Sequence, residues 1–140
     1  MESMPQRATV RSQPLIAVRD VRASSRWYQQ LLGLTTLPEH SHRDFYDRLL
    51  SAGRLVLQLH AWDKEDHPNL VNAEAAPVGH GVLVWFEVDD FDEVVIQARV
   101  LGAQIILEPH VNPAPGHREI WLRDPDGYVV VVASRDGESR

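Results

Sequence analysis

The spacing of hydrophobic residues changes several times along the chain, and each change marks a predicted element. Residues 14–19 (Pro-Leu-Ile-Ala-Val-Arg) predict a short strand, with proline at its start, where a missing N–H does least harm. A helix is expected next, because Asp20 suits the N-cap position and Gly33 suits the residue after the last turn. Its predicted buried stripe comprises Ser24, Trp27, Tyr28 and Leu31.

Extended segments are expected after this helix. One begins at 34–37, and two more, 46–52 and 54–61, form a predicted hairpin that turns at Ser51-Ala52-Gly53. Residues 62–80 are polar and show no clear period, so they are expected to form a connection.

The same plan starts again after the connection. Residues 81–89 predict an apolar strand, and Asp90 caps a second predicted helix, with Glu93 at the capping-box position and Gly102 at its end. The buried stripe of this helix is expected to comprise Phe91, Val94, Val95, Ala98 and Leu101. The last three predicted strands are 104–108, 118–123 and 128–134.

The two halves therefore form an internal repeat of about 70 residues, each with the order βαβββ. Segments 18–21 and 32–33 of the first half correspond to 88–91 and 101–102 of the second. The predicted organisation is an N-terminal tail (1–12), one domain (13–134) and a C-terminal tail (135–140). Within the domain, module one covers 13–61, the connection 62–80 and module two 81–134.

A tight turn near the C-terminus joins the last two predicted strands. In Asp124-Pro125-Asp126-Gly127, proline presets φ at the second turn position and glycine accepts a positive φ. The strand that follows is apolar throughout 128–133, so it needs packed material on both of its faces.

This turn and the repeat together resemble the vicinal oxygen chelate superfamily, which includes glyoxalase I, fosfomycin- and bleomycin-resistance proteins and extradiol dioxygenases. The resemblance covers 13–134. It implies an α+β fold in which two βαβββ modules form curved mixed sheets around a cavity, with each helix on the convex side. It also implies a homodimer, because members of this superfamily often pair modules across subunits.

The composition excludes several classes of partner. The net charge is −6 and the chain has a single lysine, without the basic stripe that nucleic-acid binding requires. No run of apolar residues approaches the roughly 20 that a membrane span needs, and the polar N-terminus does not resemble a secretory signal. The sequence has no cysteine, so we expect a cytoplasmic protein without disulfides.

Alternation along the strands predicts which side chains face the cavity. In 54–61 a face made of Leu55, Leu57 and Leu59 suits helix packing, which leaves Val56, Gln58 and His60 for the cavity. In 118–123 the residues opposite the apolar face are Glu119, Trp121 and Arg123. The pattern of 81–88 allows either face to point inward, and Glu87 favours the face that comprises Leu83, Trp85 and Glu87.

The resemblance also implies where a metal would bind, because metal-dependent relatives take one His, Glu or Gln ligand from each of four strands. On this chain the four positions are Gln13, Gln58, Leu83 and Val131. Two are aliphatic and two are amides, so we expect the usual metal site to be absent and predict no cofactor. The alternative is a displaced site for a divalent metal ion, whose candidate ligands are His60, Glu87, Glu119, His110 and His117.

The tryptophans favour a small-molecule pocket. Trp85 and Trp121 offer flat faces for stacking, and nearby polar side chains orient a ligand. The predicted ligand-binding set is Gln13, Gln58, Leu83, Trp85, Glu87, Trp121 and Val131. Alternatively, the tryptophans fill the core between the modules.

Two further residues, His60 and Glu119, are candidates for general acid–base catalysis. The alternative interpretation pairs Glu119 with Arg118 or Arg123 and assigns His60 to the end of a strand. The leading hypothesis is metal-independent binding of a small, partly aromatic molecule. The competing hypothesis is a lyase, isomerase or dioxygenase that uses a relocated metal or an acid–base pair. A module with a vestigial, filled cavity is the third.

Overall fold

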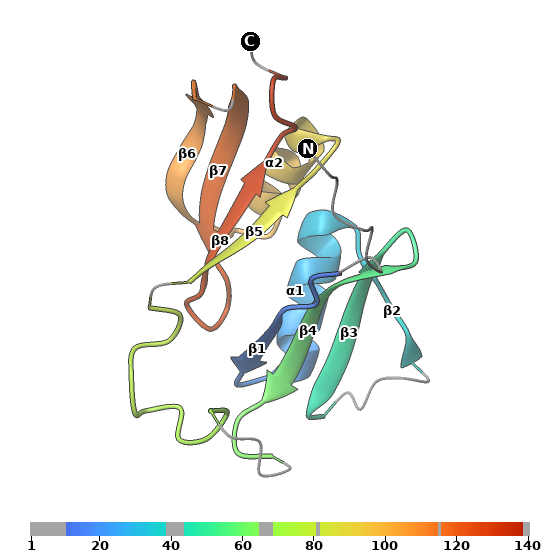
Figure 1. Ribbon diagram of the computed structural model, residues 1–140, viewed down its shortest axis with the longest axis vertical. Helices are drawn as coiled ribbons and strands as arrows, with labels where there is room; N and C mark the ends of the chain where they lie inside the picture. The colour runs from blue at the N-terminus through green and yellow to red at the C-terminus, as the bar shows by residue number, and fades with distance from the viewer. Residues whose placement is uncertain (1–10, 39–43, 65–68, 81, 115, 139–140) are drawn as a thin grey trace, which may run out of the picture.

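The computed structural model describes residues 11–38, 44–64, 69–80, 82–114 and 116–138 of the 140-residue chain. The first half of these residues forms β1 (Leu15–Val18), α1 (Val21–Leu32), β2 (Thr35–Thr36), β3 (Tyr46–Ser51) and β4 (Arg54–Ala61). The second half forms β5 (Leu83–Glu87), α2 (Phe91–Val100), β6 (Gln104–Asn112), β7 (His117–Arg123) and β8 (Val129–Ala133) (Figure 1). The predicted α+β repeat of two βαβββ modules is confirmed.

Each module has a mixed sheet with the same strand order. The first sheet runs β1-β4-β3-β2 and the second runs β5-β8-β7-β6. In each sheet the first strand pairs parallel with the last, β1 with β4 and β5 with β8, and the other pairs are antiparallel. The strands β1 and β5 therefore occupy equivalent sheet edges, and Figure 1 shows the helix of each module against one face of its sheet.

Both helices begin and end where the sequence predicts. The Asp20 carboxylate accepts a hydrogen bond from the amide of Ala23 at 3.0 Å, and Gly33 adopts a left-handed conformation with φ of 68°. At α2, Asp90 accepts from the amide of Glu93 at 3.1 Å. The Glu93 carboxylate accepts from the side chain of Gln97, one turn further along the helix.

The core extends through both modules and follows the predicted alternation for most strands. Leu57 and Leu59 of β4 and Ile120 and Leu122 of β7 are fully buried. They belong to one hydrophobic cluster that also contains Tyr28 of α1 and residues of α2. The opposite face of each sheet is therefore the one that can carry ligand-binding side chains.

The leucine face predicted for β4 is shorter than expected. A register shift occurs between Leu49 and Leu50, so that Leu49 pairs with Leu57 while Leu50 pairs with Leu55. This bulge inserts Val56 between the two pairs and breaks the period-two alternation. Leu55 is half-buried and lines a surface pocket, in contrast to the fully buried Leu57 and Leu59.

The strand predicted at 104–108 continues to Asn112 despite Pro109. β6 is the outer strand of its sheet, where a residue without an N–H is tolerated. Two register shifts against β7, between Ile105 and Leu107 and between Leu107 and His110, accommodate the irregularity.

The turn 124–127 forms hydrogen bonds that connect the second module to the first. Asp126 accepts hydrogen bonds from the amide of Arg19 at 2.7 Å and from the hydroxyl of Ser24 at 3.2 Å, at the beginning of α1. The hydroxyl of Tyr128 donates to the carbonyl of Ala17 at 2.9 Å. A turn that is local in sequence therefore supplies contacts between the modules.

The two predicted tails differ in how far the structure describes them. Residues 1–10 lie outside the described residues, whereas Asp136 and Glu138 of the C-terminal segment contact β7. Within the parts of the chain that the structure describes, neither helix is long and apolar enough to cross a membrane.

Candidate ligand-binding site

The two tryptophans predicted to face the cavity lie on the same face of the second sheet. In the strand order β5-β8-β7, Val131 pairs with Trp85 on one side and with Trp121 on the other. Directly paired residues project from the same face, so these three form a tryptophan row (Trp85, Val131 and Trp121) opposite the buried Val130 and Val132. Val131 has no exposed surface, whereas Trp85 is 46% exposed and Trp121 is half-buried.

The neighbouring rows contain the other predicted residues of this module. Leu83 pairs with Val129, which pairs with Arg123, and Glu87 pairs with Ala133, which pairs with Glu119. Leu83, Trp85 and Glu87 therefore share the sheet face opposite the buried Val84. Leu83 is exposed like Trp85, and Glu87 is exposed at the end of β5.

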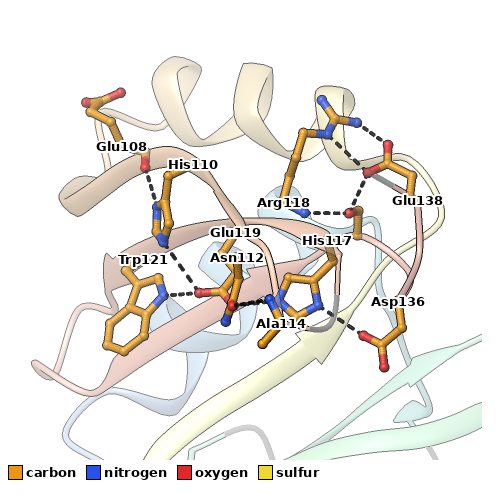
Figure 2. Close-up of polar contacts among 11 residues, drawn as sticks. Glu108, His110, Asn112, Ala114, His117, Arg118, Glu119, Trp121, Asp136 and Glu138 are labelled. Carbon is orange, nitrogen blue, oxygen red and sulfur yellow. Dashed lines mark hydrogen bonds and ion pairs between the residues drawn. The ribbon is translucent and has the colours of Figure 1, made fainter. Parts of the chain in front are cut away.

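Glu119 lies at the centre of a buried polar cluster, the Glu119 cluster, formed with His117, Asn112 and Trp121 (Figure 2). Its side chain is 4% exposed. Oε1 accepts from the indole N–H of Trp121 at 2.9 Å, and Oε2 accepts from the amide of Asn112 at 3.1 Å and from Nε2 of His117 at 2.5 Å. Nε2 of His110, whose side chain is 40% exposed, lies 3.6 Å from Oε1.

His117 is held between two carboxylates. Its Nε2 faces Glu119 and its Nδ1 lies 3.0 Å from Asp136 in the C-terminal segment. Ionised carboxylates only accept hydrogen bonds, so both ring nitrogens donate and the ring is an imidazolium in this arrangement. The indole of Trp85 contacts the same ring, with centroids 6.0 Å apart.

The contacts change the proton affinities of both groups. Burial acts to raise the pKa of Glu119, but hydrogen bonds from His117, Trp121 and Asn112 outweigh it and leave that pKa below its usual value. Burial acts to lower the pKa of His117, but the hydrogen bonds to Asp136 and Glu119 outweigh it and raise that pKa. Each shift favours the charged form of its group, because each charge stabilises the other.

A small apolar pocket lies where the two modules meet. Its volume is about 300 Å³, and β1 and β4 contribute Leu15 and Val56 while β5 contributes Leu83, Trp85 and Phe86. We call it the inter-module groove. Its Leu15, Leu83 and Trp85 side chains are all more than one-third exposed, so a ligand can reach the edge of the tryptophan row.

The four positions at which the resemblance implies metal ligands do not fit a metal ion. The amide of Gln58 is already used, because its Oε1 accepts from the hydroxyl of Tyr46 at 2.6 Å and its Nε2 donates to the carbonyl of Gln13 at 2.9 Å. Leu83 and Val131 have no donor atom. Among the described residues, no group of three or more His, Cys, Asp or Glu side chains is arranged to hold a metal ion.

The structure places the two candidate catalytic residues on different sheets. His60 is buried on β4, with Nδ1 2.8 Å from the carbonyl of Ala61 and its ring 6.0 Å from that of Phe45. Glu119 lies on β7, with His117 as its nearest titratable partner. The alternative pairing of Glu119 with Arg118 is wrong, because Arg118 contacts Glu138 instead (Figure 2). Arg118 also contacts Asp92 of α2 at 2.8 Å.

Sequence reasoning missed two members of this region. Asn112 lies beyond the predicted end of its strand, and Asp136 lies in the predicted C-terminal tail. The only local signal was that each residue lies near the end of a strand neighbouring β7 or β8 in the chain, Asn112 at the end of β6 and Asp136 shortly after β8. Their contacts depend on how β6 and the C-terminal segment lie beside β7.

Comparison with known proteins agrees with this architecture. The sequence profile of the glyoxalase/bleomycin resistance protein/dioxygenase superfamily matches residues 11–132. The chain belongs to this superfamily. Its two βαβββ modules and mixed sheets are therefore the fold of this superfamily.

Several solved structures of this fold are similar to the chain. A glyoxalase/bleomycin resistance protein/dioxygenase family enzyme from Burkholderia phytofirmans PsJN has a TM-score of 0.70 and 22% identity, covering 86% of this chain and 94% of that one. An integron cassette protein from V. cholerae has a TM-score of 0.68 and 18% identity, covering 94% and 98%. The fosfomycin resistance protein FosX from Mesorhizobium loti has a TM-score of 0.63 and 16% identity, covering 91% and 93%. A search of curated protein sequences found no significant match.

Proposed function

We propose that this superfamily member binds a small, partly aromatic molecule without using a metal ion. The observation that carries the proposal is the tryptophan row, in which an exposed and a half-buried indole lie on either side of Val131. Indole faces provide a large contact area at low conformational cost. The inter-module groove offers adjoining apolar surface for the rest of the ligand.

The Glu119 cluster supports a positioning role for that carboxylate. Three donors already occupy its oxygens, and its lowered pKa makes it a weak base. Its hydrogen bond to the Trp121 indole instead fixes the orientation of the ring that a ligand would contact. A pre-oriented ring loses less entropy when the ligand binds.

The competing hypothesis, an enzyme with a relocated metal, has less support. The candidate ligands His110, His117 and Glu119 lie close together, but Nε2 and Nδ1 of His117 are both committed to carboxylates. An imidazolium does not coordinate a metal. Binding therefore agrees better with the hydrogen bonding of this cluster than catalysis does.

A homodimer remains part of the proposal. The outer strand β6 exposes Ile106, Leu107 and Val111, and this apolar surface favours contact with a second copy. Size-exclusion chromatography with light scattering tests this point. The measurement begins at about 1 mM, a concentration at which weak association is detected, and continues through 100-fold dilutions. A protein that is monomeric at every concentration would contradict the proposal.

The binding proposal is tested by titrating a library of aromatic compounds while following tryptophan emission and melting temperature. We expect compounds that quench emission and raise the melting temperature, and we expect Trp121→Ala to remove both effects. Trp62→Ala is the matched control, because Trp62 lies outside the tryptophan row and does not line the inter-module groove. No response from any compound, or an equal loss in both variants, would contradict the proposal.

Metal content is measured on the same preparations. Elemental analysis of protein purified without chelator is expected to show less than stoichiometric zinc, manganese, nickel and iron. Stoichiometric metal that is lost in His110→Ala would instead favour the enzyme hypothesis.

A further inference from the structure

A second pocket of the first module contains three arginines. Its volume is about 840 Å³, and Arg11, Arg48 and Arg54 line it together with Gln13 and the apolar side chains Leu55 and Val56. We call it the arginine pocket. No carboxylate belongs to its lining within the described parts of the chain.

Arg48 projects from the sheet face that carries the predicted ligand positions. It pairs directly with Gln58 across β3 and β4, and Gln58 pairs with Leu15 of β1, so the three side chains share one face. The adjacent carboxylate, Asp47, is buried on the opposite face, where it accepts from the hydroxyl of Ser25 at 2.6 Å. Alternation along β3 therefore separates Arg48 from its nearest acidic neighbour in sequence.

One buried atom of the Arg48 guanidinium has no hydrogen-bond partner among the described residues. Its Nε has almost no contact with solvent, and no described residue accepts a hydrogen bond from it. Buried polar atoms in folded proteins are nearly always satisfied, so the Arg48 side chain is not fully paired by the described residues. The acceptor that fits a guanidinium fork is a carboxylate, phosphate or sulfonate.

Several other described arginines of this acidic chain are paired with carboxylates. Arg99 contacts Glu108 at 2.8 Å, and Arg118 contacts Asp92 at 2.8 Å. The arginine pocket therefore differs from the rest of the surface, because it concentrates positive charge in a protein whose net charge is −6. Such a local excess attracts anions.

We infer that the arginine pocket binds the anionic group of the ligand, so that the protein takes small aromatic acids in preference to neutral aromatics. This inference rests on the proposed function and names its substrate class. Val56 lines both the arginine pocket and the inter-module groove, so the two sites adjoin. A ligand with its ring in the groove places an acidic substituent beside Arg48.

The test compares indole-3-acetate with indole-3-acetamide by isothermal titration calorimetry. The two compounds share a ring and differ in charge. We expect the acetate to bind at least tenfold more tightly, and we expect Arg48→Gln to abolish that preference without weakening the acetamide. Arg48→Lys should retain part of it, because a point charge replaces the bidentate fork.

Arg26→Gln is the matched control. Arg26 is exposed on α1 and does not line the arginine pocket, so this variant carries the same charge change at a different place. It should keep the preference for the acetate. If Arg48→Gln unfolds, as judged from its melting curve, Arg54→Gln replaces it, because Arg54 is exposed beside the hairpin turn and should reduce the preference.

The outcomes separate the two proposals. Equal binding of both compounds to the wild type, unchanged in Arg48→Gln, would overturn the anion site and leave aromatic binding intact. If neither compound binds, the library titration decides the aromatic proposal, and inorganic phosphate tests the arginines alone. Phosphate binding that Arg48→Gln removes would support the anion site, and no phosphate binding would overturn it as well.

Discussion

Tyr28 of α1 donates a hydrogen bond of 2.8 Å to Asp124, which begins the turn between β7 and β8. The two residues are 96 positions apart, and both are buried. The other oxygen of Asp124 accepts from the amides of Asp126 and Tyr128, each at 2.9 Å. One carboxylate therefore shapes the turn of the second module and binds it to the helix of the first.

Loss of the Tyr28 hydroxyl should destabilise the protein. In Tyr28→Phe the buried Asp124 oxygen loses its donor, and we expect the free energy of unfolding in urea to fall by about 1–3 kcal/mol. Tyr46→Phe is the control, because Tyr46 is half-buried and its hydroxyl bonds to the neutral Gln58. A smaller cost for Tyr28→Phe than for Tyr46→Phe would contradict the role assigned to this bond.

Stability should decline as His117 loses its proton. The folded-state pKa is raised above the ordinary value of 6.5, so its contribution is complete below about pH 6.5 and is lost as the pH rises through the folded pKa. Urea unfolding at pH 5.5 and 8.5 measures the decline. We expect His117→Gln to reduce it and His110→Gln, which changes a more exposed ring, to preserve it. An unchanged slope in His117→Gln would contradict the prediction.

Removing the charge of Glu119 should release the His117 proton more easily. The Glu119→Gln side chain keeps its size but no longer attracts the imidazolium, so the pKa of His117 should fall in an NMR titration of the ring nitrogens. Asp92→Asn serves as the control, because Asp92 contacts Arg118 on the other face of β7. A similar His117 pKa in wild type and Glu119→Gln would show that Asp136 dominates.

The pH profile of Glu119 has the opposite sign. Its folded-state pKa lies below the ordinary value of 4.5, so its contribution is present above about pH 4.5 and is lost as the pH falls through the folded pKa. Glu119→Gln should therefore lose less stability than the wild type during acidification. Urea midpoints between pH 3 and pH 5.5 provide the measurement, and parallel curves for the two proteins would exclude this contribution.

Gly79 should tolerate alanine poorly. A Cβ at this position would lie 2.7 Å from the ring of Tyr128, whose hydroxyl bonds to the first module, and φ is +70°. Gly53 has a similar φ of +78° with open space around it. Both alanine variants carry left-handed strain, so the excess cost of Gly79→Ala, about 1–3 kcal/mol in urea unfolding, isolates the steric clash. Equal costs would contradict it.

Much of the fold follows from local patterns. The caps at Asp20 and Asp90, the left-handed Gly33 and the hairpin at 51–53 all use side-chain or backbone preferences that act within a few residues. The register also places Leu83, Trp85 and Glu87 on one face of β5, because alternation is a property of each strand alone. These features were predictable from the sequence.

Several features of the site depended on contacts between distant segments. The bulge that turns Leu55 away from the core results from how β3 pairs with β4, and the donors Asn112 and Asp136 reach Glu119 and His117 only because β6 and the C-terminal segment lie beside β7. The isolation of Arg48 from carboxylates is likewise a matter of neighbouring strands.

The amino-acid sequence by itself determined the two βαβββ modules, their caps and the shared sheet face of Trp85 and Trp121, because hydrophobic period and capping chemistry act over short distances along the chain. Only the tertiary structure decided the partners of Glu119, His117 and Arg48, because proton affinity and ion pairing depend on which groups meet in space after burial removes the competing water.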